Sequence, residues 1–189
     1  MKSQLFIAFR LTLTMMVLCC VAYPALVWAT AQLAPGRGEG VQLSSKGRLV
    51  GFANVGQKFD KPQNFNSRPS AADYHADGSS GSNKGPSNPE YLAQVKARLD
   101  TFLVHNPGVK AADVPAELLT ASGSGLDPHL SPQGALVQVA RVAAARHLAP
   151  ARVQALVQQY VEPGLLGPDK VNVLQLNLAL DALDQPAGR

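Results

Sequence analysis

The most chemically capable stretch of this sequence is Leu118–Pro132, which contains Ser122, Ser124, Asp127 and His129. Serine, histidine and aspartate are the residue types of a nucleophilic triad. In such a triad an imidazole takes the hydroxyl proton and a carboxylate orients the imidazole. The composition of this stretch therefore raises hydrolysis through a serine nucleophile as a chemistry to consider.

The local sequence argues against that chemistry. A nucleophile elbow of the Gly-x-Ser-x-Gly type would need glycine at position 120 or 122, where Thr120 and Ser122 stand. Pro128 also holds Asp127 and His129 in an extended dipeptide. We therefore interpret the stretch as a structured Gly/Ser turn and expect no catalytic residue. A membrane-anchored exported serine hydrolase that uses Ser122 or Ser124 is the enzyme alternative.

Glycine-rich segments can also bind phosphate through their backbone amides. The Walker pattern Gly-x-x-x-x-Gly-Lys-Ser/Thr does not occur, and Lys84–Gly85 has the order of its last two elements reversed. The phosphate signal is accordingly unspecific. The residues that could contact a nucleotide on this basis are Ser122, Gly123, Ser124 and Gly125.

A cluster of potential metal ligands occurs at Asp73, His75 and Asp77. A metal site would need further ligands nearby, and the other histidines are scattered along the chain. We interpret these side chains as solvated loop residues. The sequence thus predicts no metal ion and no cofactor bound by this chain alone.

A long apolar segment near the N-terminus is a candidate membrane anchor for the rest of the chain. No charged residue occurs from position 11 to 36, and about 20 helical residues suffice to cross a bilayer core of roughly 30 Å. We predict a tail over 1–10 and a transmembrane helix over 11–31. The alternative is a cleaved signal peptide ending near Ala29–Ala31, but its apolar region would be unusually long.

The numbers of basic residues on the two sides of this helix are nearly equal, so they do not decide its orientation. A short N-terminal tail is easier to leave in the cytoplasm, and large domains translocate largely regardless of charge. We therefore expect the N-terminus inside and the domain outside the membrane.

Composition excludes several classes of function. The formal net charge of +4 falls further once the basic residues before the apolar segment are set aside, so there is no basic stripe for nucleic acid. The two cysteines, Cys19 and Cys20, lie inside the apolar segment. A disulfide framework and a cysteine nucleophile are therefore not expected in the body of the chain.

The body of the chain, 32–189, reads as one compact α+β domain with a small sheet and about four helices. A hairpin is expected over 41–59, followed by a long loop over 60–89 that is rich in Gly, Ser, Asn and Pro. Apolar spacing then predicts helices. These begin at Pro89, at Ser131–Pro132, near Pro150 and at Asn172, and the third extends to Val161. The last combines strand-like alternation of leucines with helix-favouring composition, and we assign it to helix.

Ordered strings along the chain resemble a known family. They are Arg68–Ala71, Ser79–Asn83, Gly85–Pro89, Thr120–His129, Ser131–Pro132, Arg141–Val142, Val171–Leu174 and Leu176–Asp181. Together with the single N-terminal apolar segment, they resemble the C subunit of the bacterial Kdp potassium-transporting P-type ATPase. The resemblance covers nearly the whole chain.

This resemblance implies a non-catalytic accessory subunit in the bacterial inner membrane. Its expected partners are the ATP-hydrolysing B subunit, the potassium-translocating A subunit and the lipid bilayer. ATP and potassium would be handled by the complex. The family is described as needed for assembly and as a catalytic chaperone that raises the ATP affinity of the hydrolytic subunit. An exported domain could not reach cytoplasmic ATP, so assembly is the role that agrees best with the orientation we expect.

The same strings suggest which residues contact partners. The partner-contact candidates are Arg68, Ser79, Ser80, Gly81, Asn83, Asp127 and His129. The loop 60–89 is too poor in apolar residues to order itself by its own packing. We therefore expect it to be held either by a partner or by the turn at Ser122–Asp127.

Overall fold

The computed structural model describes residues 2–183 and divides the chain into two units, Met1–Gln42 and Leu43–Arg189. Met1 of the predicted tail and residues 184–189 of the predicted domain lie outside the described residues. The two units are treated separately below.

The N-terminal unit is a long helical segment followed by a short turn. It consists of α1 (Lys2–Val17), a π-helical segment η1 (Leu18–Ala22), α2 (Tyr23–Ala31) and the 3-10 turn η2 (Pro35–Gly38). The π-helical segment lies directly before Pro24, which has no N–H to donate and whose ring displaces the carbonyl one turn earlier. The N–H of Tyr23 accordingly bonds to the carbonyl of Leu18, five residues back.

This helical segment can cross a membrane by length and composition. Its apolar part runs over Ser3–Ala31, 29 residues, which at 1.5 Å per residue spans about 43 Å. Thr14 and Thr30 donate their hydroxyls to carbonyls within the helix, so these polar groups are satisfied without water. The helix ends at Ala31, as predicted, but begins at Lys2, so residues assigned to the tail are helical.

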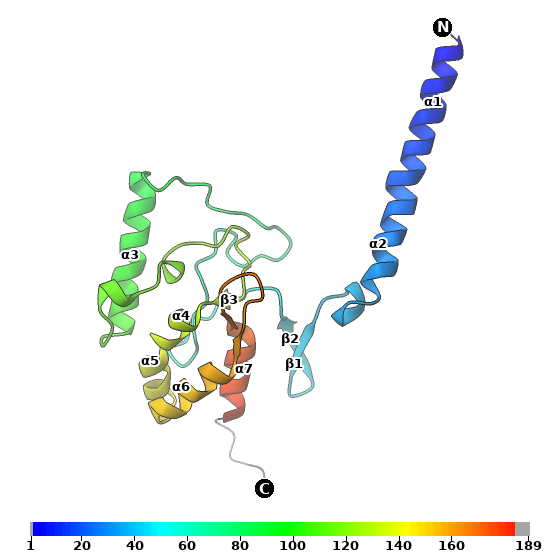
Figure 1. The fold of residues 1–189 in the computed structure, drawn as a ribbon. Helices are drawn as coiled ribbons and strands as arrows, with labels where there is room; N and C mark the ends of the chain where they lie inside the picture. Colours follow the sequence, from blue (N-terminus) through cyan, green and yellow to red (C-terminus); the bar gives the residue numbers. More distant parts are fainter. Residues whose placement is uncertain (1, 184–189) are drawn as a thin grey trace. The chain divides into compact units, whose positions relative to one another are not determined.

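The domain begins with the predicted hairpin, made of β1 (Gln42–Ser45) and β2 (Arg48–Phe52) (Figure 1). The two turn residues, Lys46 and Gly47, both have positive φ, of 51° and 75°. Such a pair is typical of the tight turns that match the twist of antiparallel strands. Between this hairpin and Pro89 the chain forms the predicted long loop, with no helix or strand.

The first helix of the domain is α3 (Pro89–His105). The side chain of Asn88 accepts a hydrogen bond from the N–H of Tyr91 at 2.9 Å, and Pro89 occupies the first turn, as predicted. Two 3-10 turns follow, η3 (Ala111–Asp113) and η4 (Ala116–Leu118).

The helix predicted from Ser131 is interrupted. It forms α4 (Pro132–Leu136) and α5 (Val139–Ala145), with Gln138 at the break. The fully buried Gln138 side chain donates to the carbonyl of Gly134 at 2.9 Å and reaches the backbone of Asn66. The break therefore follows from a buried side chain that competes with the helical ladder.

The third predicted helix, α6 (Pro150–Gln159), ends earlier than expected. Val161 instead begins β4 (Val161–Glu162), because Pro163 favours an extended residue before it. A second sheet that the sequence did not indicate has the order β3–β5–β4, with β3 (His129–Leu130) and β5 (Lys170–Asn172). Both pairings are antiparallel, with His129 opposite Asn172 and Val161 opposite Val171.

The last element is helix α7 (Val173–Leu183), which confirms the helical assignment. Asn172 caps it by accepting from the N–H of Gln175 at 3.1 Å. Val173, Leu176, Asn177 and Leu180 are buried, at helical rather than strand spacing.

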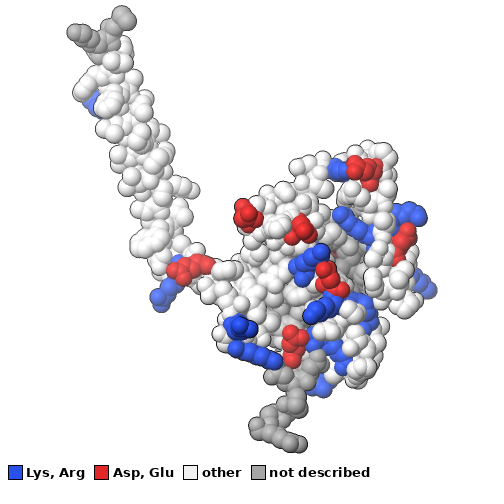
Figure 2. Space-filling model, turned by 180° about the vertical axis from the view of Figure 1, so that it is seen from behind, with Lys and Arg blue, Asp and Glu red and all other residues white. Residues whose placement is uncertain are grey.

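The core of the domain is formed mainly by buried aliphatic side chains of α4 to α7 and β5, with Phe65 of the long loop inserted among them. The fold is thus α+β, as predicted. On the face shown in Figure 2, Lys and Arg side chains are interspersed with Asp and Glu over the domain, whereas the apolar helix is almost uncharged.

Candidate functional site

The Gly/Ser turn, Ser122–Asp127, is a junction for segments from distant parts of the domain. The carbonyl of Ser124 accepts from the N–H of Ser80 and from the hydroxyl of Ser79, both at 3.1 Å. The carbonyl of Gly125 accepts from the Ser70 hydroxyl at 2.6 Å. Of the two expected supports for the long loop, a partner or this turn, these contacts show that the turn holds it at Ser70, Ser79 and Ser80.

Gly125 permits this close approach. Its φ is +70°, and a Cβ placed on it would lie 2.8 Å from the carbonyl oxygen of Ser80 and 2.9 Å from the Cβ of Ala72. A side chain here would be strained by the backbone and would also collide with the loop. The glycine-rich composition therefore serves packing of backbone against backbone.

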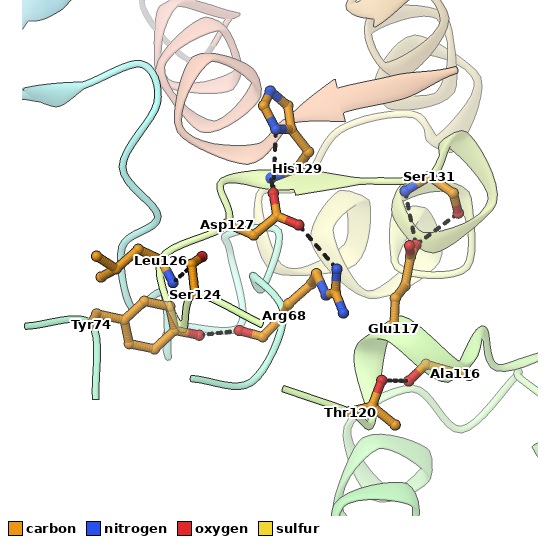
Figure 3. Close-up of polar contacts among 10 residues, drawn as sticks. All are labelled: Arg68, Tyr74, Ala116, Glu117, Thr120, Ser124, Leu126, Asp127, His129 and Ser131. Carbon is orange, nitrogen blue, oxygen red and sulfur yellow. Dashed lines mark hydrogen bonds and ion pairs between the residues drawn. The ribbon is translucent and has the colours of Figure 1, made fainter. Parts of the chain in front are cut away.

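Asp127 is the last residue of the turn and the one residue in it with an ionisable side chain. Its Oδ2 accepts from Nη1 of Arg68 at 3.0 Å, and its Oδ1 accepts from the backbone N–H of His129 at 3.0 Å (Figure 3). The His129 ring also approaches, with Nδ1 3.3 Å from Oδ1. The hydrogen bonds from His129, with the Arg68 charge, lower the pKa of Asp127 from 3.8 to about 2 against the opposing effect of burial.

Arg68 is itself positioned by the loop. The Tyr74 hydroxyl donates to the carbonyl of Arg68, and the N–H of Tyr74 donates to the Ser70 hydroxyl at 2.9 Å. Burial, aided by the charges of Asp60 and Asp73, raises the pKa of Tyr74 to about 12, so this phenol remains a donor at neutral pH. The Arg68–Asp127–His129 cluster is thus fixed by Tyr74 at Arg68 and by the backbone of His129 at Asp127.

The two serines of the suspected triad are engaged in the turn itself. Ser124 Oγ accepts from the N–H of Leu126 at 3.1 Å, and Ser122 is buried. Asp127 and His129 are paired, but Figure 3 shows the Ser124 side chain directed to Leu126, away from the His129 ring. The geometry thus supplies an aspartate–histidine pair without presenting a serine hydroxyl to it.

The remaining partner-contact candidates face different ways. Ser79 and Ser80 bond to the turn, as described, and Gly81 packs so closely that a Cβ on it would lie 3.0 Å from the carbonyl of Gly123. Asn83 is exposed and has a positive φ of 52°. Asn83 and Ser80 are therefore exposed without a side-chain bond to the turn, whereas the exposed Ser79 donates its hydroxyl to it.

A second polar network, which the sequence did not reveal, fixes the segment around Phe65. Asn177 accepts from the N–H of Phe65 at 2.8 Å and donates to its carbonyl at 3.0 Å. Gln138 pairs in the same way with the backbone of Asn66. Side-chain amides from α7 and from the break between α4 and α5 thus replace the backbone partners that a strand would give this loop.

Arg141 completes this network. It makes five hydrogen bonds, which use all five guanidinium N–H groups. The acceptors are the carbonyls of Pro62 and Asn64 and the side chains of Asn66, Asn106 and Gln138. Burial lowers the pKa of Arg141 to about 10, which leaves it charged at neutral pH. Only its place in a family-like string marked this residue in the sequence, because contacts over such separations leave no local pattern.

A cleft lies beside Arg141. It has a volume of about 590 Å³, and Asp60, Arg98 and His105 line it with Arg141. Because every donor of Arg141 is already used, this residue offers nothing to an anion there. Among residues 2–183, no group of three His, Cys, Asp or Glu side chains is arranged to bind a metal ion.

Comparison with known proteins gives a consistent result over nearly the full length. The family model described as "KdpC: K+-transporting ATPase, c chain" matches residues 5–182. Curated proteins named "Potassium-transporting ATPase KdpC subunit" are similar to this chain. The one from Flavobacterium johnsoniae is 51% identical over 181 residues, covering 96% of this chain and 99% of the relative. Those from Bacteroides thetaiotaomicron and Gemmatimonas aurantiaca are 51% and 45% identical, covering 95% and 97% of this chain and 98% and 94% of the relatives.

Proposed function

The chain belongs to the KdpC family of K+-transporting ATPase c chains, and from this premise we propose that it is the non-catalytic subunit that assembles and stabilises the potassium-transporting complex. The observation that carries the proposal is the similarity over residues 5–182, which includes both the apolar helix and the domain. The partners would be the ATP-hydrolysing B subunit and the potassium-translocating A subunit.

The N-terminal unit supports the membrane part of this role. A single apolar helix of 29 residues with exposed side chains needs lipid or a partner helix around it. We place this helix in the bacterial inner membrane with the N-terminus inside and the domain outside. In that arrangement the chain would meet its partners both within the bilayer and on the outer side.

The candidate site supports a structural rather than a catalytic role for the domain. Arg68 and Asp127 form an ion pair, His129 contacts the same carboxylate, and Arg141 donates its hydrogen bonds to groups within the chain. An active site keeps such groups available for substrate. In this domain they fix a long loop in one shape, which is what a surface for partner recognition requires.

A chaperone effect on ATP would follow from the same role. With the domain outside, Ser122 to Gly125 could not touch cytoplasmic ATP, and the N–H of Gly125, one of the amides that could bind phosphate, donates to the carbonyl of Ser122 at 3.3 Å. Any increase in the ATP affinity of the hydrolytic subunit would therefore be transmitted through the assembled complex. ATP and potassium would be ligands of that complex.

The experiment is purification through a tag on the ATP-hydrolysing subunit, from cells that express all subunits or all but this chain. The expected result is that omission of this chain abolishes potassium-stimulated ATPase activity and lowers recovery of the potassium-translocating subunit. A KM for ATP measured across a titration of the chain tests the chaperone effect. Full recovery and full activity without this chain would contradict the proposal.

One observation keeps the hydrolase as a second candidate: Asp127 and His129 already form the acid–imidazole half of a triad. Treatment of the full chain with a fluorophosphonate probe decides between the two. We expect no labelling of the wild type. Labelling that disappears in Ser124→Ala or Ser122→Ala would instead establish the hydrolase.

A further inference from the structure

The turn between β4 and β5 exposes two leucines on the surface of the domain. Leu165 is 94% exposed and Leu166 is 100% exposed. Single exposed apolar residues are common on protein surfaces, but two adjacent leucines with almost no contact of their own are unusual. These residues do nothing for the core, so their position calls for another explanation.

The tip Gly164–Gly167, which carries these leucines, is held in one shape. The N–H of Gly164 donates to Oδ1 of Asp169 at 3.1 Å. A Cβ on Gly164 would overlap the carbonyl of Gly167, so the two ends of the tip lie against each other. Pro163 and Pro168 flank the tip and restrict its backbone further. The leucines are therefore presented on a preorganised turn, and little conformational entropy would be lost on binding.

The surrounding charges do not suit a lipid surface. Lys170, the nearest basic residue along the chain, is paired with Glu162 at 3.5 Å, and Asp169 adds a negative charge beside the tip. Elements that lie on bilayers combine apolar residues with basic ones and often with aromatic ones. A tip with an excess of acidic groups would be repelled by anionic headgroups, so a protein is the better occupant.

The size of the tip indicates what kind of protein it can bind. A stable interface buries about 800 Å² per partner, far more than two leucines offer, so the tip cannot by itself hold a second copy of this chain. A small contact becomes useful when a second attachment raises the effective concentration of the partner. The apolar helix over Ser3–Ala31 provides such an attachment for any partner embedded in the same membrane.

Building on the proposed function, we propose that Leu165 and Leu166 insert into an apolar pocket on the outer surface of one membrane-embedded partner, the potassium-translocating subunit. The tip would act as the extracytoplasmic half of a two-point attachment, with the helix as the other half. Truncating the two side chains should then weaken assembly without affecting the fold of the domain.

The first experiment uses the full chain in the complex. The double variant L165S/L166S should raise the amount of chain needed for half-maximal potassium-stimulated ATPase activity roughly tenfold or more. The matched control is V104S on α3, which replaces another exposed aliphatic residue, 77% exposed, and should leave that amount unchanged. The melting temperature of each full chain in detergent should equal that of the wild type.

The second experiment identifies the occupant. A photo-cross-linking amino acid at position 166 in the purified complex should form a product with the potassium-translocating subunit, and the same label at position 104 should not. Cross-linking to the ATP-hydrolysing subunit, to lipid, to a second copy of this chain or to nothing would overturn the inference, as would wild-type activity of L165S/L166S. If the wild-type chain itself is dispensable for activity, the proposed function fails instead, and the two failures are thereby distinguished.

Discussion

At the scale of single residues, Asp127 joins parts of the chain that are distant in sequence. One carboxylate oxygen accepts from Arg68, 59 residues away, and the other receives the backbone N–H of His129. The exposed fraction of the Asp127 side chain is only 30%, so these interactions are partly shielded from solvent. A partly shielded carboxylate with charged donors contributes more than a surface ion pair does.

We predict that Asp127→Asn destabilises the full chain by about 1–2 kcal/mol at neutral pH. Because folding lowers the pKa of Asp127 from 3.8 to about 2, its stabilisation is present above pH 4 and is lost as pH falls towards 2. The difference between wild type and variant should therefore shrink over that window in urea unfolding followed against pH. Asp100→Asn, in an exposed pair with Lys96, should show almost no difference. A gap that stays constant down to pH 2 would contradict the assignment.

Arg141 is the second residue on which a distant segment depends. Arg141→Lys should destabilise the chain by about 2–3 kcal/mol, because an ammonium has three donors and cannot serve five acceptors arranged around a planar fork. The measurement is urea unfolding of the full chain in detergent. Arg152→Lys, at an exposed position of α6, is the matched control and should stay within about 0.5 kcal/mol of wild type. Equal stability of the two variants would show that the network around Phe65 is dispensable.

At the scale of elements, the sequence was informative where the signal was local. The early hairpin, the start of α3 at Pro89 and the start of α7 beside Asn172 each depend on a few neighbouring residues, and each was predicted. The break at Gln138 was not, because the buried Gln138 side chain bonds to the backbone of Asn66, which is distant in sequence. The sheet β3–β5–β4 was missed since its strands have only two or three residues, too few to show alternation.

The same distinction applies to the candidate site. Residues Arg68, Asp127 and His129 were all singled out beforehand, yet only the fold shows that they touch one another. Asn177 and Gln138 were not recognised as functional, because their roles consist of contacts with one distant loop. The spacing of neighbouring residues does not indicate contacts between distant segments, whereas a cap or a turn depends on a few adjacent residues.

The attachment of the long loop to the Gly/Ser turn gives a prediction at this scale. Gly125→Ala should detach the loop, because the new Cβ would collide with Ser80 and the φ of +70° disfavours any side chain. Amide hydrogen exchange should rise at least about tenfold across 68–83 while α6 and α7 keep their protection. Gly123→Ala is the control, since a Cβ there meets nothing within 4 Å. Unchanged exchange in Gly125→Ala would mean that the loop is ordered by other contacts.

At the scale of the whole molecule, the chain consists of an apolar helix and a domain whose polar groups are largely satisfied by one another. The apolar window over Ser3–Ala31 is 0% buried, so its side chains are exposed along its whole length. The domain in turn has its own core of α4 to α7. The proposed function requires the helix and the domain to remain one chain, since each would meet the partners in a different place.

We therefore predict that the helix is retained as an anchor and is not removed as a signal peptide. The uncharged segment after Arg10 is longer than the apolar region of a cleaved signal, and the helix continues through Ala31 without a break in its hydrogen bonding other than the π-helical segment before Pro24. Intact mass of the membrane-extracted protein should correspond to a chain that keeps residues near Met1. Protease added to intact spheroplasts should digest the domain and leave a cytoplasmic marker uncut. A mature start at Gln32 would contradict the anchor, and a protected domain would contradict the orientation that the two-point attachment requires.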